Sequence, residues 1–219
     1  MEIEYLILFI IFSIGVKLLA HRNKKKSEET RKRMLDRVNQ AKRVEEFRNS
    51  KDFQHPISNS IINLLENFHH HKEVGKRLNE DEIKAFEERL KLNLPESYKI
   101  FLKYFGDGGS WVFSQCIYSV QEYYYLHETS ESLGETIELD GEFIAVNSLL
   151  SLMTEDSNGG AWCWLTAENK KEWSLAYYSM QDQKLHYRVD NFTEWLNLLT
   201  KDGYEVIRGL DLEEKLGLG

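Results

Sequence analysis

The sequence predicts an α+β domain, in which helices pack on an antiparallel sheet, preceded by an N-terminal transmembrane helix and a helical stalk. An apolar run opens the chain, a basic stretch without Gly or Pro follows it, and the remainder combines helical periodicity with short aromatic-rich segments. We place the membrane anchor at residues 1–20, a basic cytoplasmic stalk at 21–55, the α+β domain at 56–205 and a tail at 206–219.

The net charge of −8 conceals two electrically different parts of the chain. Residues 21–48 hold 11 Lys and Arg against five Asp and Glu, a net charge of +6. Residues 49–219 hold 16 against 29, a net charge of −13. Two cysteines, Cys116 and Cys163, are too few for a disulfide framework and indicate buried thiols in a reducing compartment.

The first 20 residues predict a single membrane span. An apolar run from Tyr5 to Val16 continues beyond Lys17 to Ala20. About 18 residues at about 1.5 Å each cover about 27 Å, enough for the hydrocarbon core. The acidic start and the basic block after the run argue against a cleaved secretory signal, and they place the C-terminal domain in the cytoplasm. A buried or interfacial helix is the alternative.

Residues 27–49 predict a stalk helix, because they are good helix formers without Gly or Pro. A thin apolar stripe follows it: Met34, Leu35, Val38, Ala41 and Phe47. The cations could contact acidic lipids or nucleic acid. A solvated helix beside the membrane is the simpler interpretation, and no direct nucleic-acid partner is expected.

Three helices are expected next, within 57–71, 79–92 and 95–105. Asn79 and Glu82 have the spacing of a capping box, and Pro95 suits a first helical turn. Gly106 is expected to end the last helix in the left-handed conformation. Because these glycines follow a helix rather than precede one, a phosphate-binding loop is disfavoured. The adjacent histidines 69–71 lack metal-ligand spacing, so no metal and no cofactor is expected.

From Trp111 onwards the pattern becomes strand-like. We expect a strand at 111–119, a helix at 119–133, a strand with a short following element at 141–153, three antiparallel strands at 161–167, 174–180 and 184–190, and a closing helix at 191–200. Ser119 would cap the middle helix and Asn191 the closing one.

The segment DEIKAFEERLKLNLPESYKIFLKYFGDGG, residues 81–109, resembles the opening of the SUKH superfamily. An acidic helix there leads to an LP-x-x-Y-K-x-F-L helix that ends on glycines. The later FIAVNSL, DSNGGAWCWLT, SLAYYSM and NFTEWLNLL follow the family order, so the likeness covers about residues 79–200. Residues 111–141 match no motif of the family, and the anchor and stalk lie outside its domain.

The resemblance implies an immunity protein of a bacterial polymorphic toxin system, which binds and neutralises a cognate toxin domain, often a nuclease. The alternative is a membrane-associated regulatory scaffold for cell-wall or envelope synthesis, the role of fungal relatives. No catalytic motif is recognisable, so we expect a binding protein and no enzyme, although an unrecognised active site remains a third class. The acidity could steer a basic nuclease or only provide solubility. The candidate partner-binding residues are Asp107, Trp111, Tyr124, Glu155, Asp156, Glu168 and Asp182.

Overall fold

The computed structural model describes residues 24–28, 30–32, 34–67, 74–112, 115–128, 133–152, 160–167 and 171–201. The chain divides into two compact units, residues 1–46 and 47–219. The first unit holds most of a long helix, which we call the N-terminal helix; its described residues, 24–28, 30–32 and 34–48, are all helical. The stalk helix expected from composition is therefore confirmed where it is described.

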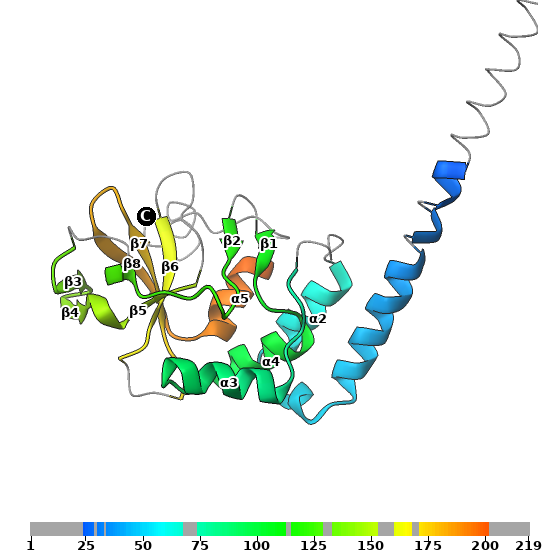
Figure 1. The fold of residues 1–219 in the computed structure, drawn as a ribbon, viewed down its shortest axis with the longest axis horizontal. Helices are drawn as coiled ribbons and strands as arrows, with labels where there is room; N and C mark the ends of the chain where they lie inside the picture. The colour runs from blue at the N-terminus through cyan, green and yellow to red at the C-terminus, as the bar shows by residue number, and fades with distance from the viewer. Residues whose placement is uncertain are drawn as a thin grey trace, which may run out of the picture. The chain divides into compact units, whose positions relative to one another are not determined.

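The second unit combines helices with antiparallel strands (Figure 1), as the sequence predicts. Its elements are η1 (Lys51–Gln54), α2 (Ser58–Asn67), α3 (Glu80–Leu90), α4 (Glu96–Tyr104), β1 (Gly109–Val112), β2 (Gln115–Ile117), η3 (Leu126–Glu128), β3 (Thr136–Leu139), β4 (Glu142–Ala145), η4 (Val146–Ser148), β5 (Leu149–Ser151), β6 (Gly160–Leu165), β7 (Leu175–Ser179), β8 (Lys184–Val189) and α5 (Phe192–Lys201).

The main sheet has four antiparallel strands in the order β5-β6-β7-β8, while β1-β2 and β3-β4 form two separate hairpins. The predicted meander of three aromatic-rich strands is confirmed as β6, β7 and β8. The predicted single strand at 111–119 is wrong, because this segment folds back as the β1-β2 hairpin. The β3 strand was not anticipated at all.

One face of the main sheet packs on helices through aromatic rings. Trp162 and Trp164 of β6 are both about 1% exposed or less. The ring centroids of Trp164 and Tyr98, on α4, lie 5.2 Å apart, and those of Trp162 and Trp195, on α5, lie 6.1 Å apart. Edge-to-face pairs of this kind bury large areas and hold both helices against the sheet.

The other face of the sheet carries smaller side chains and is covered by the β3-β4 hairpin. Cys163 and Leu165 of β6 share a buried cluster with Ile137 and Leu139 of β3. The sheet therefore lies between helices on one side and a hairpin on the other (Figure 1). Every residue of β6 is buried, as expected for a strand covered on both faces.

Local signals define the starts of α3 and α5 as the sequence predicts. The Asn79 side chain accepts from the Glu82 N–H at 2.9 Å, and Glu82 accepts from the Asn79 N–H at 2.9 Å, which confirms the capping box. The Asn191 side chain accepts from the Glu194 N–H at 2.9 Å and caps α5. The first turn of α4 is instead satisfied from a distant loop, where Glu172 accepts from the Ser97 N–H at 3.1 Å.

Gly75 and Gly106 allow two segments, one before α3 and one after α4, to approach closely. A Cβ on Gly75 would lie 1.6 Å from the Asp107 carbonyl oxygen, and one on Gly106 would lie 2.6 Å from the Gly75 carbonyl oxygen. The predicted left-handed helix stop is wrong, because Gly106 has φ +158° and α4 ends on Phe105 in the right-handed region. Gly106 is needed for backbone proximity rather than for a helix cap.

The helix predicted at 119–133 is also wrong over residues 119–128. Glu122 accepts from the Ser119 N–H at 3.0 Å and donates its own N–H to the Ser119 carbonyl at 2.8 Å, which closes a turn. Tyr125 then forms an isolated β-bridge with Leu150. The Tyr123 hydroxyl bonds to that of buried Tyr98. Tertiary partners thus outweigh a weak helical propensity.

No helix within the described residues is long and apolar enough to cross a membrane. The span predicted at residues 1–20 lies outside the part of the chain that the structure describes, as does the predicted tail at 206–219. The histidines 69–71 lie outside it as well.

Candidate partner-binding surface

The β3-β4 hairpin turns one face to the core and the other away from it. Ile137 and Leu139 of β3 are 6% and 2% exposed, and each fully buried aliphatic side chain contributes about 1.5–3 kcal/mol. The strands are joined by Asp140 and Gly141, with φ of 52° and 83°. Two positive φ angles define a tight turn whose twist matches the strands. The hairpin is thus a rigid support for its outer face.

That outer face carries an exposed phenylalanine among carboxylates. Phe143 is paired across the hairpin with Glu138, so both side chains point away from the core. Phe143 is 74% exposed, which is unusual for so large an apolar side chain. Residues 133–148 contain four carboxylates, Glu135, Glu138, Asp140 and Glu142, and no Lys or Arg. All four of these acidic residues are exposed.

One of the carboxylates also anchors the hairpin to the main sheet. Arg188 of β8 donates to Glu142 of β4 at 3.0 Å, and the arginine side chain is 23% exposed. Glu142 pairs with Leu139 and so lies on the side of the hairpin that faces the main sheet, whereas Glu138 lies on the outer face beside Phe143. We call Glu135, Thr136, Glu138, Asp140 and Phe143 the hairpin surface. An exposed aromatic side chain beside a carboxylate, in an acidic segment, suits a partner with a basic rim around an apolar pocket.

The sequence reasoning missed Phe143, although a signal for it was present. The run TIELDGEFIA, residues 136–145, has two alternating stretches around an Asp-Gly pair, which is a strong short-range indication of a hairpin. Had β3 been recognised, the pairing of the two strands would have placed Phe143 opposite Glu138 on the solvent side.

Asp107, one of the predicted contact residues, is only 8% exposed. Its Oδ1 accepts from the Val120 N–H at 2.8 Å, and so it joins the segment after α4 to the segment after β2. Burial raises the pKa of this carboxyl to about 6, and the nearby charge of Glu122 acts in the same direction. Asp107 therefore connects two segments inside the domain.

Asp182 and Tyr124 lie in two other parts of the second unit. Asp182 is in the turn between β7 and β8, where His186 Nε2 lies 2.9 Å from its Oδ2. Partial burial opposes its ionisation, but hydrogen bonds from Ser179 and His186 outweigh it and lower the pKa of Asp182. Tyr124 is half-buried, and its hydroxyl lies 3.1 Å from that of Tyr118.

The structure describes the remaining predicted contact residues only in part. Trp111 belongs to β1, but its side chain is not among the described ones. Glu155, Asp156 and Glu168 lie outside the described residues. The predicted set is therefore not brought together into one patch by the described part of the chain.

The groups that could support chemistry include a thiol, histidines and carboxylates. Cys163 is fully buried, and burial raises the pKa of its thiol to about 12, which disfavours the nucleophilic thiolate. Within the described ranges, no group of three or more His, Cys, Asp and Glu side chains is placed to hold a metal ion.

Comparison with known families agrees with this fold. A profile of the SUKH group described as SMI1-KNR4 cell-wall matches residues 80–196. The chain belongs to this SUKH family. The match begins at α3, includes both hairpins and the main sheet, and ends within α5. No curated protein matches the chain in sequence. The SUKH domain therefore contains the hairpin surface and excludes the N-terminal helix.

Proposed function

We propose that this SUKH protein is an immunity protein that neutralises a cognate toxin domain by stoichiometric binding at the hairpin surface, without catalysis. The observation that carries the proposal is the 74% exposure of Phe143 opposite Glu138, in a segment with four carboxylates and no cation. Family membership supports a protein–protein role. The net charge of −13 over residues 49–219 would favour a basic partner such as a nuclease.

The proposal includes attachment to the cell membrane through residues 1–20, with the SUKH domain in the cytoplasm. The support is the apolar run from Tyr5 to Val16 and the basic block after it. Deletion of residues 1–26 is expected to reduce protection of cells at equal expression while toxin affinity in solution stays the same. Protection that is unaffected by the deletion would rule out a role for the tether.

The central experiment measures binding of the full chain, in non-ionic detergent, to the toxic C-terminal domain encoded by a neighbouring gene. We expect a 1:1 complex by calorimetry, and Phe143→Ala should weaken it by about 2 kcal/mol, or about 30-fold. Met180, 47% exposed in the turn after β7, provides the matched control. Met180→Ala should change affinity by less than about twofold. Equal effects of the two variants would contradict binding at the hairpin surface.

A regulatory scaffold for cell-wall or envelope synthesis is the second candidate, favoured by the cell-wall description of the matching family. It predicts that affinity purification of the full chain recovers envelope-synthesis proteins. It also predicts that Phe143→Ala disturbs the envelope in cells that carry no toxin. Recovery of a toxin domain that Phe143→Ala abolishes would decide for immunity.

A further inference from the structure

One side of the N-terminal helix carries small and apolar side chains, which we call the stripe. Of the residues expected there from the sequence, Leu35 lies about 100° from Met34 and Phe47 is buried. Met34 and Val38 are 65% and 51% exposed. At about 100° per residue, Ser27, Thr30, Val38 and Ala41 all lie within about 40° of Met34 around the helix axis. A stripe of small and apolar side chains this long needs an occupant to cover it.

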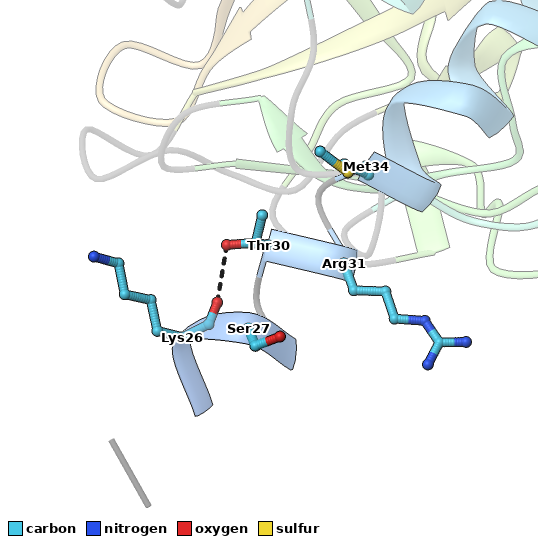
Figure 2. Close-up of a pocket in the computed structure, with 5 residues that line it drawn as sticks. All are labelled: Lys26, Ser27, Thr30, Arg31 and Met34. Carbon is cyan, nitrogen blue, oxygen red and sulfur yellow. Dashed lines mark hydrogen bonds between the residues drawn. The ribbon is translucent and has the colours of Figure 1, made fainter. Parts of the chain in front are cut away.

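Cations line both sides of this stripe. Arg31 and Lys42 lie about 60–80° from Met34 in one direction, and Arg37 and Lys26 lie about 60–80° away in the other. Figure 2 shows the first turns of this arrangement, where Lys26 and Arg31 extend in opposite directions with Thr30 between them. The Thr30 hydroxyl donates to the Lys26 carbonyl at 2.9 Å and so turns its methyl group outward from the backbone.

The carboxylates among the described residues of this segment lie elsewhere on the helix. Glu28 and Asp36 are about 120° and 160° from Met34, on the side opposite the stripe. Glu45 is the first carboxylate aligned with the stripe, one turn beyond Ala41. The apolar and cationic face therefore spans residues 24–42 and ends at Glu45.

We propose that residues 24–42 lie along an anionic membrane surface, with the stripe in the headgroup region and the flanking cations on lipid phosphates. Charge complementarity selects this occupant. Lys and Arg side chains beside an apolar stripe can extend their charged ends to the phosphates while their stems cover lipid. A second copy of the helix would place the same rows of cations against each other. The proposal concerns how the helix lies and goes beyond the tether at residues 1–20.

The test uses the full chain in lipid vesicles with an environment-sensitive fluorophore on a single cysteine. Val38→Cys places the label on the stripe, and Asn39→Cys places it about 140° from Met34 as the matched control. Both carry Cys116→Ser, whereas buried Cys163 does not label in the folded protein. Vesicles contain either phosphatidylcholine alone or phosphatidylcholine with phosphatidylglycerol, with a quencher attached to the lipid headgroup region.

With anionic vesicles we expect a blue-shifted, lipid-quenched signal at position 38 and a water-exposed signal at position 39. Arg31→Gln and Arg37→Gln should each weaken this docking about fivefold, because each cation near an anionic surface contributes about a factor of five. Lys25→Gln, on the opposite side of the helix, should have a much smaller effect.

Three results would overturn the proposal in distinguishable ways. If the chain co-floats with the vesicles but position 38 stays in water, the surface-lying helix is refuted and the tether is retained. If the chain co-floats with neither vesicle type, the tether is refuted as well. A signal at position 38 that rises with protein concentration and is not quenched by lipid assigns the stripe to a second copy.

Discussion

Replacing Asp107 with asparagine tests whether burial determines what this carboxylate does. The carboxylate is 8% exposed and accepts from the Val120 N–H at 2.8 Å. Asparagine keeps a carbonyl oxygen for this hydrogen bond and removes the charge. The variant therefore separates the energetic cost of burying a charge from the loss of a contact.

The pKa of Asp107 gives the size and the sign of the effect. Burial raises it from 3.8 to about 6, so the folded protein takes up a proton more readily than the unfolded chain. The stabilisation from this proton is complete below about pH 4 and is lost as the pH rises through about 6. A pKa shift of this size corresponds to about 3 kcal/mol of folding free energy, and about 2 kcal/mol of this stabilisation is present at about pH 4.5. Solvent screening reduces the measurable part to about 1 kcal/mol.

Urea unfolding of the full chain in detergent, followed by tryptophan fluorescence, measures the free energy of unfolding of both proteins directly. At about pH 7.5, Asp107→Asn should be more stable than the wild type by about 1 kcal/mol, and at about pH 4.5 the difference should vanish. A difference that is the same at both pH values would refute the argument from burial. Loss of toxin affinity with unchanged stability would instead assign Asp107 to the partner interface.

Three further perturbations address the packing of the second unit. In the folded protein the Lys103 Nζ lies 2.5 Å from the nearly buried Asp52 carboxylate, so Lys103→Met leaves that carboxylate without its cation. Urea unfolding should show a loss of about 2–3 kcal/mol in the free energy of unfolding, and Asp52→Asn should restore part of it. Gly75→Ala should lower thermal stability by about 3 kcal/mol or more, because its Cβ meets a backbone carbonyl at 1.6 Å; Gly134→Ala, with 3.8 Å of clearance, should change it by less than about 0.5 kcal/mol. Cys163 should react with thiol reagents only at the rate of unfolding, and immediate reaction of the folded protein would contradict its burial.

The elements that the sequence predicted well are those with local signals. The caps at Asn79 and Asn191 depend on residues three positions away, and both are found as expected. The aromatic-rich strands of the main sheet were recognisable because each is short, β-branched or aromatic, and bounded by polar turns. Helix ends and strand identities of this kind need no knowledge of the tertiary fold.

The errors fall where distant residues determine the backbone. Tyr123 and Tyr125 looked helical together, but the hydroxyl of Tyr123 bonds to Tyr98 and the backbone of Tyr125 pairs with Leu150. Likewise, the conformation of Gly106 follows from the approach of Gly75, about 30 residues earlier in the chain. The local sequence around these residues does not reveal any of the three distant partners.

The candidate surface was missed for a related reason. Glu142, Phe143 and Ile144 have no decisive alternation by themselves, so the exposed side of β4 is defined only by its register with β3. Asp107, by contrast, was selected for its charge, and its burial follows from a hydrogen bond to Val120 across the chain. Charge and residue type suggested an acidic surface with exposed aromatic side chains, and the backbone register determines which residues of the hairpin are exposed.

Under the proposed function, the alternation along the hairpin would let one fold serve different partners. Ile137 and Leu139 are buried against the main sheet, and replacing either would cost core stability. Glu138 and Phe143 lie on the opposite face and are not members of that cluster. Because a strand separates its two faces residue by residue, the partner-facing positions can change while the inward positions preserve the fold. Substitutions at Glu138 and Phe143 should therefore alter partner choice at little cost in folding free energy.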